Sequence, residues 1–395
     1  MTRRLLVVVY AYPPSSLSAA VRWGALTKYL AEMGHSITVV TSDSFGSPSV
    51  PDPVQVVRPR SLETAPFTRR RDLNPRVAWA PVATRAARRL LREEAFDCVV
   101  TTSPPESAHL VGLLLGGRRP AWIADFRDGW CFEPYTERFR AKTALAVDRW
   151  LERRVALTAD LTVGVTRPIA DDLAERLGTH SRWIPNGWDP AVSAAKESNL
   201  PPFEPDGVRL VYTGGLWGEW GRNPEPLFRA IKTVVSDANP SRLKLVYAGT
   251  LKPEDRALID STGVSDVFED VGQLDRAEAL ALQHSADTLV LITSRNSSEA
   301  TGKLFEYLAA GKPIVALAEG NEAERIVRET NTGVVVPPDD VDAIADALRR
   351  AARGDLAREY APRGVERYSY PHLAEEMVAV IEEAIAVHQS RRSRA

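Results

Sequence analysis

The chain has 395 residues, which is too long for one ordinary hydrophobic core, so we expect two domains. Its hydrophobic content of 44% and charged content of 26% are typical of a soluble globular protein, and no apolar run approaches membrane-spanning length. The two cysteines, Cys98 and Cys131, support neither a disulfide framework nor a cysteine metal cluster. We therefore expect a cytoplasmic protein.

The formal net charge is −2, but residues 1–190 are net basic and the remainder is net acidic. A basic half indicates either an anionic partner or surface, or only the ordinary scatter of charged side chains. Both interpretations stay open. Nucleic acid is not an expected partner, because the basic residues are not interleaved with a recognisable binding module.

The chain opens with the pattern of a doubly wound sheet. Leu5–Tyr10 is an apolar run that predicts a buried strand, Val21–Met33 has helical spacing, and Ser36–Ser42 predicts the next strand. The loop before the helix has Ala19-Ala20 in place of a G-x-G-x-x-G motif. A dinucleotide-type redox site is therefore poorly supported.

Residues 44–80 contain prolines and the triple Arg69-Arg70-Arg71, which predicts a long surface excursion. The segment Val82–Ala95 predicts an amphipathic helix, and its basic residues are Arg85, Arg88, Arg89 and Arg92. Such a helix either docks on anionic lipid at the inner face of a membrane or is an outer helix with solvated arginines. The sequence leaves both alternatives open.

Two further strands end in polar residues. Cys98–Thr102 runs into Ser103-Pro104-Pro105, with His109 on the following helix, and Trp122–Ala124 runs into the segment Asp125–Trp130. Ligand crevices lie at the carboxyl edge of parallel strands, where charged side chains are costly unless they are used or paired. We interpret Asp125, Arg127 and Asp128 as site residues, with a structural cluster of the three as the alternative.

The first half closes with a predicted strand at Leu161–Val165 and a Pro-Asn-Gly turn within Trp183–Pro190. A linker follows at Glu197–Asp206, and the second half then restarts the pattern. Val208–Tyr212 predicts a strand that leads into a glycine-rich loop from Gly214 to Arg222. Glycines allow a backbone to approach a ligand closely, and an arginine can hold a phosphate.

Two more strands of the second half end in glycine, Leu243–Ala248 at Gly249 and the run that closes with Val271-Gly272. Gly333–Pro337 precedes a helix around Val341–Ala351. The terminal helix near His372–His388 ends in Arg391–Arg394, which we expect to be a frayed tail.

The segment Thr301–Pro313 predicts a helix between two buried strands, Thr288–Thr293 and Ile314–Ala318. Gly302 and Lys303 fall at its start, where unpaired backbone N–H groups and the helix dipole favour an anion. Glu306, one turn later, is suited to vicinal sugar hydroxyls. The alternative is an ordinary ion pair between Lys303 and Glu306 on a solvated face.

Four motifs of this chain resemble those of family 4 retaining glycosyltransferases of the GT-B fold: Gly302–Pro313, Pro185–Asp189, Gly214-Gly215 and Gly333–Pro337. The N-terminal half resembles one bacterial branch, associated with surface polysaccharides, in Tyr12-Pro13-Pro14, Ser103-Pro104-Pro105 and Asp125–Asp128. The resemblance implies an α/β protein with two Rossmann-like domains facing across a cleft. Residues 1–195 would bind the acceptor, residues 206–370 would bind the nucleotide sugar, and residues 371–395 would cross back to the N-terminal domain.

The resemblance also implies roles for single residues. Family members carry two glutamates separated by seven residues, of which the second matches Glu306 as the ligand of the ribose. The first falls on Ser298, one place before Glu299, so Glu299 and Thr301 are alternatives for the contact with the donor sugar. The implied donor-binding residues are Gly214, Gly215, Arg222, Gly249, Gly272, Glu299, Thr301, Gly302, Lys303, Leu304 and Glu306.

By the same resemblance, Arg222 and Lys303 take the places of the basic ligands of the diphosphate, and Asp128 or Arg127 takes that of a charged residue after the central N-terminal strand. These four are the predicted catalytic residues. The residues assigned to the acceptor side are Ser18, Arg22, Ser103, His109, Asp125 and Trp130.

No acidic cluster with metal-ligand spacing is present in the sequence, so the expected reaction needs no metal and no cofactor besides the donor. The expected partners are a nucleotide sugar and a glycan, lipid-linked or small-molecule acceptor. A sugar-nucleotide 2-epimerase of the same architecture and a non-catalytic nucleotide-sugar-binding protein are the alternatives. The sequence names neither the base, nor the sugar, nor the acceptor.

Overall fold

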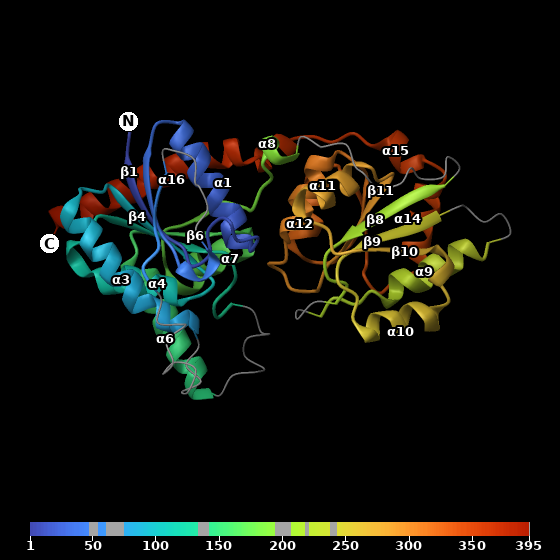
Figure 1. Cartoon of the computed structure of the whole chain (residues 1–395), viewed down its shortest axis with the longest axis horizontal. Helices are drawn as coiled ribbons and strands as arrows, with labels where there is room; N and C mark the ends of the chain where they lie inside the picture. The colour runs from blue at the N-terminus through green and yellow to red at the C-terminus, as the bar shows by residue number, and fades with distance from the viewer. Residues whose placement is uncertain are drawn as a thin grey trace. The chain divides into compact units, whose positions relative to one another are not determined.

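A computed structural model of the chain describes residues 1–46, 54–60, 75–132, 142–193, 207–217, 221–237 and 243–394. The chain divides into two compact units, each built around one parallel sheet (Figure 1). The first unit comprises Met1–Asn186 together with Tyr370–Ala395, and the second unit comprises Gly187–Ser369. The predicted linker Glu197–Asp206 and the triple Arg69-Arg70-Arg71 lie outside the described residues.

The first unit contains a seven-stranded sheet in the order β3-β2-β1-β4-β5-β6-β7. Its strands are β1 Arg4–Val8, β2 Ser36–Val40, β3 Val54–Val57, β4 Cys98–Ser103, β5 Ala121–Phe126, β6 Leu161–Gly164 and β7 Ser181–Trp183. The strand order reverses between β1 and β4, which pair in parallel with Leu6 opposite Val99. In doubly wound sheets, ligands bind at the carboxyl edge beside such a reversal.

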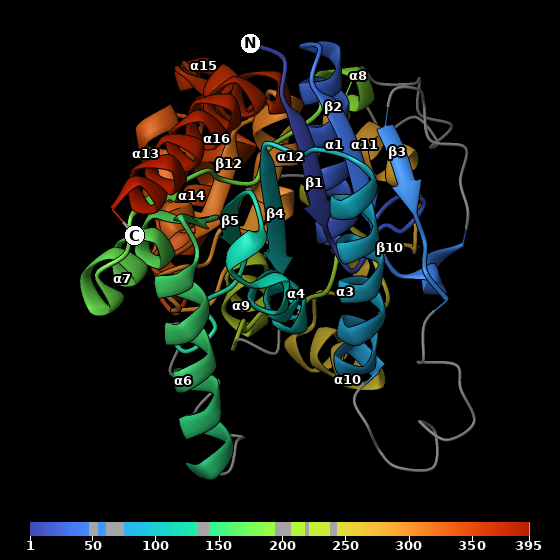
Figure 2. The ribbon, with the colours of Figure 1, turned by 90° about the vertical axis from the view of Figure 1, so that its left-hand side faces the viewer.

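Helices cover both faces of this sheet (Figures 1 and 2). One face is covered by α1 Ser18–Glu32 and α16 Tyr370–Ser393, and the other by α3 Pro75–Glu93, α4 Ser107–Leu115, α6 Lys142–Thr158 and α7 Arg167–Leu177. Side chains of β1 alternate accordingly: Leu5 and Val7 pack with α1 and α16, whereas Leu6 and Val8 pack with α3. This double burial explains why the strand is an uninterrupted apolar run.

The second unit contains a six-stranded parallel sheet in the order β10-β9-β8-β11-β12-β13. Its strands are β8 Val208–Thr213, β9 Leu243–Ala248, β10 Phe268–Gly272, β11 Thr288–Ile292, β12 Ile314–Leu317 and β13 Gly333–Val336. Its longer helices are α9 Glu225–Val235, α10 Pro253–Thr262, α11 Arg276–His284, α12 Gly302–Ala310, α13 Glu322–Thr330 and α14 Val341–Ala352, with the short α8 Pro190–Ser193 and α15 Asp355–Glu359. The core on one face joins β8, β9, β11 and β12 to α9, α10 and α14.

The structure differs from the sequence predictions in three places. The surface excursion predicted for residues 44–80 contains the strand β3, and α3 begins at Pro75, before the predicted start at Val82. The tail predicted to fray is helical to Ser393, because Arg391 has partners in the first unit. The other predicted strands and helices are found, with ends shifted by a few residues.

The amphipathic pattern of α3 is explained by its packing on the sheet. Its apolar side, with Ala83, Ala87 and Leu90, is buried in the core of the first unit. The exposed arginines on its other side are Arg85, Arg88, Arg89 and Arg92. No helix among the described residues combines the length and the apolar composition needed to cross a membrane. The contact of this helix with anionic lipid stays a prediction.

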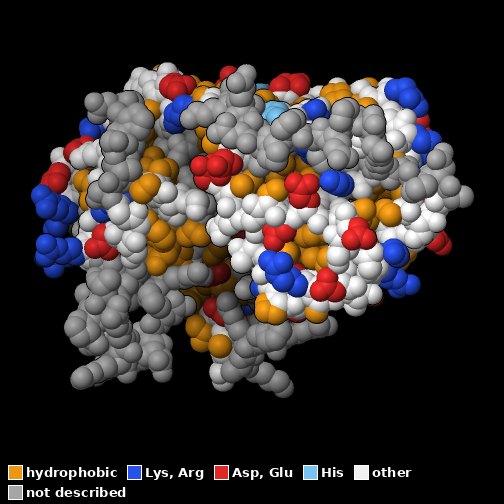
Figure 3. Space-filling model, turned by 45° about the vertical axis from the view of Figure 1, so that its right-hand side comes forward, with side chains coloured by type: hydrophobic (Ala, Val, Ile, Leu, Met, Phe, Trp, Pro, Cys, Tyr) orange, Lys and Arg blue, Asp and Glu red, His pale blue; other side chains and the backbone are white. Residues whose placement is uncertain are grey.

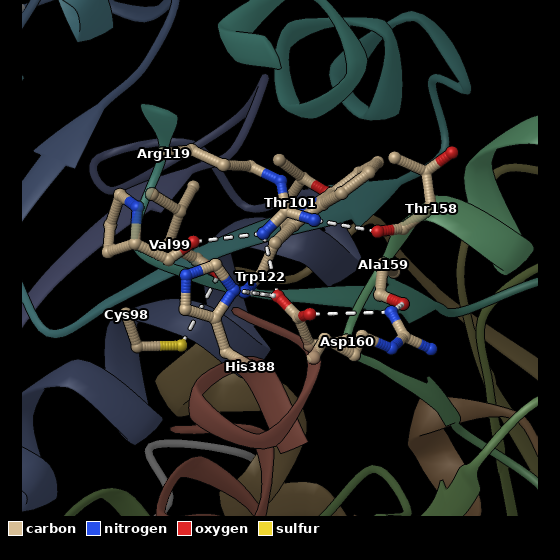
Figure 4. A network of polar contacts seen from close by, with 11 residues as sticks. Cys98, Val99, Thr101, Arg119, Trp122, Thr158, Ala159, Asp160 and His388 are labelled. Atoms are coloured by element: carbon tan, nitrogen blue, oxygen red, sulfur yellow. Dashed lines mark hydrogen bonds and ion pairs between the residues drawn. The ribbon is translucent and has the colours of Figure 1, made fainter. Parts of the chain in front are cut away.

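A buried carboxylate ties the end of α16 to the sheet of the first unit (Figure 4). Asp160, just before β6, is 2% exposed, and its Oδ2 accepts hydrogen bonds from Arg119 Nη1 at 2.6 Å and from the backbone N of Trp122 at 2.9 Å. From α16, His388 Nδ1 lies 3.0 Å from Oδ2 and Arg391 Nη1 lies 3.3 Å from Oδ1. One carboxylate therefore joins three segments that are distant in sequence.

We predict that Asp160→Asn destabilises the protein by about 3–5 kcal/mol, because Arg119 is then left buried without its counter-charge. Glu93→Gln removes the exposed ion pair with Arg89 on α3 and should change stability by less than about 1 kcal/mol. Urea unfolding of the two variants checks this. Equal stabilities would show that the Asp160 network is no anchor.

Candidate functional site

The N-terminus of α12 lies open at the carboxyl edge of the second sheet. Leu304, Phe305 and Leu308 are buried and hold the helix against the sheet, while a side chain at Gly302 would meet nothing within 4 Å. Thr301 precedes the helix without capping it, and its hydroxyl is buried with no hydrogen-bond partner among the described residues. First-turn amides and an unpartnered hydroxyl are groups that an anion with several oxygens can satisfy.

Lys303 extends from this first turn onto Tyr212 at the end of β8. Its Nζ donates to the Tyr212 hydroxyl at 3.0 Å and lies 4.1 Å from the ring centroid. Burial, followed by repulsion from Arg222, lowers the pKa of Lys303 to about 7. Gly214 permits this approach, because a Cβ there would lie 3.1 Å from Nζ and the residue has a φ of +93°.

Arg222 lies at the same edge and forms an ion pair with Glu299. Its Nε donates to Glu299 Oε1 at 2.9 Å, and the two side chains are 15% and 8% exposed. The other carboxylate oxygen accepts hydrogen bonds from the backbone N of Ser294, at 2.6 Å, and from the Ser294 hydroxyl. The loop after β11 and the last residue of the glycine-rich loop are thus joined at the predicted diphosphate site.

Glu306 forms its contacts with α11 instead of with Lys303. Its Oε1 lies 3.2 Å from Arg276 Nη2, and its Oε2 accepts a hydrogen bond from Gln283 Nε2 at 3.3 Å. Among the described residues, Lys303 and Glu306 form no ion pair, so the alternative of a solvated pair within one helix is wrong. The Glu306 side chain is 24% exposed, which leaves part of the carboxylate accessible to a ligand.

The predicted glycines line the same edge. Gly214 N donates to Ala248 O at 2.7 Å, and Gly249 N donates to Gly272 O at 2.9 Å, so the ends of β8, β9 and β10 are held together. A Cβ at Gly249 would lie 2.4 Å from the Tyr247 hydroxyl, so only glycine fits there. The carbonyl of Gly215 accepts the Tyr212 hydroxyl at 2.7 Å.

The structure thus brings together ten of the predicted donor residues, and it places Leu304 differently. The Leu304 side chain is fully buried, and its backbone N donates to Thr301 O at 3.0 Å. We therefore interpret Leu304 as a residue that seats α12 on the sheet.

In the first unit, Asp125 is paired with Arg22. Both side chains are 0% exposed, and Arg22 Nη2 lies 3.1 Å from Asp125 Oδ1. Asp125 Oδ2 also accepts hydrogen bonds from Trp23 Nε1 at 2.9 Å and from Thr102 Oγ1 at 2.7 Å. Asp125 therefore has the structural role of the alternative interpretation, although its partner is Arg22 and not Arg127.

Arg127 has separate partners at the carboxyl edge of β4 and β5. It donates from Nη1 to Ser18 Oγ at 2.9 Å, from Nη2 to Pro104 O at 2.5 Å and from Nε to Thr102 Oγ1 at 3.2 Å. Burial lowers the pKa of Arg127. Asp128, the next residue, is exposed to solvent.

His109 is an interior residue in the structure. It is 0% exposed, with Thr101 Oγ1 at 2.8 Å from Nδ1 and Ser103 Oγ at 2.9 Å from Nε2. Burial lowers its pKa to about 3, so the ring is neutral near pH 7. Trp130 is also buried, and its ring stacks on His109 at a centroid distance of 6.4 Å. Both residues are therefore part of the interior of the first unit, and their assignment to the acceptor side stays a prediction.

The charge difference between the halves does not produce a single-sign surface in the view of Figure 3. Acidic and basic side chains are interspersed there, with hydrophobic side chains between them. On this face the charged side chains are scattered as on an ordinary protein surface, and docking on an anionic surface stays a prediction.

Sequence comparisons identify the class. Residues 19–192 match a model described as "Glycosyltransferase Family 4", and residues 207–353 match one described as "Glycosyl transferases group 1". Both models describe glycosyltransferases and together they cover most of the chain, so the chain is a glycosyltransferase of the GT-B fold.

Among curated proteins, the chain is similar to a phosphatidyl-myo-inositol mannosyltransferase of Mycobacterium leprae, at 29% identity over 58% of this chain and 64% of that protein. The corresponding enzyme of Mycolicibacterium smegmatis is 25% identical over 90% of this chain and 88% of its own length. A glycogen synthase of Mycobacterium tuberculosis is 26% identical over 88% of this chain and 85% of its own length.

Solved structures support the fold. A sucrose-phosphate synthase from Thermosynechococcus elongatus superposes with a TM-score of 0.69 at 20% identity, covering 97% of this chain and 99% of that chain. WaaG, a glycosyltransferase involved in lipopolysaccharide biosynthesis, superposes with a TM-score of 0.59 at 16% identity, covering 98% of this chain and 95% of that chain.

Sequence reasoning missed the residues that hold the site residues in place. Tyr212 accepts a hydrogen bond from Lys303, and Ser294 donates one to Glu299. Glu306 is held by an ion pair with Arg276 and a hydrogen bond from Gln283. Only Tyr212 has a signal in the sequence, since it ends a predicted strand directly before the glycine-rich loop.

We predict that replacing Asp125 destabilises the protein, whereas replacing Asp128 leaves its stability almost unchanged. Asp125→Asn leaves the fully buried Arg22 without its counter-charge and should cost about 3–5 kcal/mol of stability. Asp128→Asn changes an exposed carboxylate and should stay within about 0.5 kcal/mol of the wild type. Thermal and urea unfolding check both values, and a destabilised Asp128→Asn would assign that residue a structural role.

We also predict that Lys303 makes stability depend on pH. Between its folded pKa of about 7 and its ordinary value of 10.5, the unfolded lysine holds a proton that the folded lysine has lost. Stability relative to Lys303→Met should therefore rise with pH in this range, by at most about 1.4 kcal/mol per pH unit, and be flat below it. Urea unfolding from about pH 6 to pH 9 measures this. Lys312→Met is the control, and parallel curves for wild type and Lys303→Met would contradict the shifted pKa.

Proposed function

We propose that this protein is a retaining glycosyltransferase that moves a sugar from a nucleoside-diphosphate sugar to a hydroxyl acceptor, with no metal ion and no further cofactor. The observation that carries the proposal is the cluster at the N-terminus of α12. Lys303 and Arg222 bring two cationic side chains to the amides of the first turn, beside the unpartnered Thr301 hydroxyl. A diphosphate supplies the matching charge and acceptors.

The rest of the donor fits around this anchor. Glu306 lies one turn along α12, where its accessible carboxylate can accept the two hydroxyls of a ribose. Gly272, where a Cβ would meet nothing within 4 Å, leaves room for the nucleotide at the end of β10. Gly214 and Gly249 instead allow the protein's own groups to pack closely at the ends of β8 and β9. We assign the nucleotide to this edge, with its diphosphate directed at α12.

The chemistry follows from where charge develops. Breaking the anomeric C–O bond transfers negative charge to the leaving diphosphate, and Lys303, Arg222 and the α12 amides lie where that charge forms. These positive groups supply in the protein what a metal ion supplies elsewhere. We propose that the acceptor hydroxyl attacks the same face of the sugar and passes its proton to the leaving phosphate, and we name no side-chain nucleophile.

The first unit is the proposed acceptor side, with Arg127 and Asp128 at its carboxyl edge. The relatives named above are a mannosyltransferase acting on phosphatidyl-myo-inositol and a glycogen synthase, which supports a glycan or lipid-linked acceptor. A role in surface polysaccharide or glycoconjugate biosynthesis is part of the proposal. An epimerase fold is also similar, with a TM-score of 0.62 at 13% identity to a putative UDP-N-acetylglucosamine 2-epimerase of Listeria monocytogenes, but both matching sequence models are glycosyltransferase models.

The test is a thermal-shift panel of UDP-, GDP-, ADP- and dTDP-sugars, because a bound donor stabilises the native state by mass action. We expect one base to raise the melting temperature, and Lys303→Ala to weaken binding of that nucleoside diphosphate and the rate of transfer together. Loss of one charge-assisted contact should cost about 1.5–3 kcal/mol.

Lys312→Ala, at the far end of α12, is the matched control and should bind and react as the wild type does. Absence of any donor-induced shift or transfer would overturn the proposed function. If Lys303→Ala instead binds the donor and transfers the sugar normally, the diphosphate does not bind at the N-terminus of α12.

A further inference from the structure

Both oxygens of the Glu299 carboxylate are used by the protein itself. Oε2 accepts hydrogen bonds from the backbone N and the hydroxyl of Ser294, and Oε1 accepts one from Arg222 Nε at 2.9 Å. The Glu299 side chain is 8% exposed. Oε2 has therefore filled its two lone-pair positions, and Oε1 is engaged in a nearly buried ion pair.

The loop that carries Glu299 is fixed on both sides. Glu299 N donates to Asn296 O at 3.0 Å, and Ala323 N on α13 donates to Glu299 O at 3.0 Å. Asn321, the N-cap of α13, donates from Nδ2 to Ser294 O at 2.9 Å. The position of the carboxylate is thus set by the backbone around it as well as by its own bonds.

This arrangement is unsuited to binding the hydroxyls of a sugar. A sugar hydroxyl bound at Oε1 would compete with Arg222 and leave its guanidinium unpaired. A sugar hydroxyl bound at Oε2 would displace Ser294 and leave its polar groups without a hydrogen bond. The carboxylate is instead suited to orienting Arg222, because Oε1 accepts its hydrogen bond from Nε and not from the terminal nitrogens of the guanidinium. Arg222 in turn lies close enough to Lys303 and Tyr212 to influence the pKa of both.

We propose that Glu299 is a positioning residue that holds Arg222 against the carboxyl edge of the second sheet for contact with the diphosphate, and that it does not bind the transferred sugar. The inference rests on the proposed function, since it takes a nucleoside diphosphate as the ligand of this edge. It predicts that loss of the Glu299 carboxylate lowers the affinity for a nucleoside diphosphate and for its sugar conjugate by the same factor.

The experiment is a double-mutant cycle read by calorimetry on the full chain. Wild type, Glu299→Gln, Arg222→Ala and the double variant are each titrated with UDP, GDP and ADP and with UDP-glucose, GDP-mannose and ADP-glucose. We expect Glu299→Gln to weaken the bare diphosphate and its sugar conjugate by the same factor, about tenfold, because a charge-assisted contact is lost through Arg222. In the Arg222→Ala background, Glu299→Gln should have no further effect on either ligand.

Two controls separate positioning from folding. Glu329→Gln removes a glutamate that pairs with Arg325 and Arg367 at the C-terminal end of α13, the opposite end from the Glu299 loop, and should leave both affinities unchanged. Ser294→Ala removes one donor to Glu299 as a milder change, and it should lower both affinities by a common, smaller factor. The melting temperature of every variant is measured alongside.

The outcomes are distinct. Weakening of the sugar conjugates alone would make Glu299 a sugar ligand and overturn the inference, and an equal effect in the Arg222→Ala background would reduce Glu299 to support of its loop. A wild type that binds neither these six ligands nor dTDP and dTDP-glucose would overturn the proposed function and the positioning role with it. Binding that Glu299→Gln leaves unchanged would overturn the positioning role alone.

Discussion

The first unit depends on an ion pair that water does not reach. Arg22 on α1 and Asp125 on β5 have side chains with no exposed area, and removing two charges from water costs several kcal/mol per ion unless their remaining polar atoms are bonded. Trp23 and Thr102 donate to Asp125, while Arg22 donates to the carbonyls of Ile184 and Pro185. Because these groups come from α1, β4, β5 and the segment after β7, their demand for bonding fixes four segments at one edge of the sheet. Arg127, two residues after Asp125, is thereby placed on a rigid base.

In the second unit, by contrast, the charged side chains at the carboxyl edge are partly exposed. Lys303 and Arg222 stand together at the carboxyl edge with Glu299 as the counter-charge of Arg222, and Glu306 is directed to Arg276 instead. Burial and the neighbouring guanidinium lower the pKa of Lys303, which means that the protein holds this second positive charge at a cost. Under the proposed function, a diphosphate bound beside Lys303 offsets that cost. The stabilisation would then act where negative charge develops during transfer.

Much of this fold can be predicted from the sequence because its strands are buried on both faces. Leu5–Tyr10 and Thr288–Thr293 are uninterrupted apolar runs, and each is a central strand covered by helices on either side. The edge strand β3 could not be predicted in this way, because it is short, only partly buried and preceded by prolines. Gly302, Lys303 and Glu306 could be assigned for a related reason: a helix that begins directly after a buried parallel strand must present its first turn at the carboxyl edge.

The partners of these residues could not be predicted, because local pattern does not say which distant segment covers a face. Ile123 packs with α1 and α16, so strand alternation places Asp125 on that same face, yet only the fold reveals Arg22, 103 residues earlier, as its partner. The sequence likewise predicts a frayed tail at Arg391, because its partner Asp160 lies 231 residues earlier in the chain. The loop after β11 follows the same logic on a smaller scale. Counting places Ser298 where a glutamate is expected, but the path of that loop is set by Asn321, which donates to Thr293 and Ser294 from the start of α13. The carboxylate one place later therefore points at Arg222 for a reason that lies outside the motif.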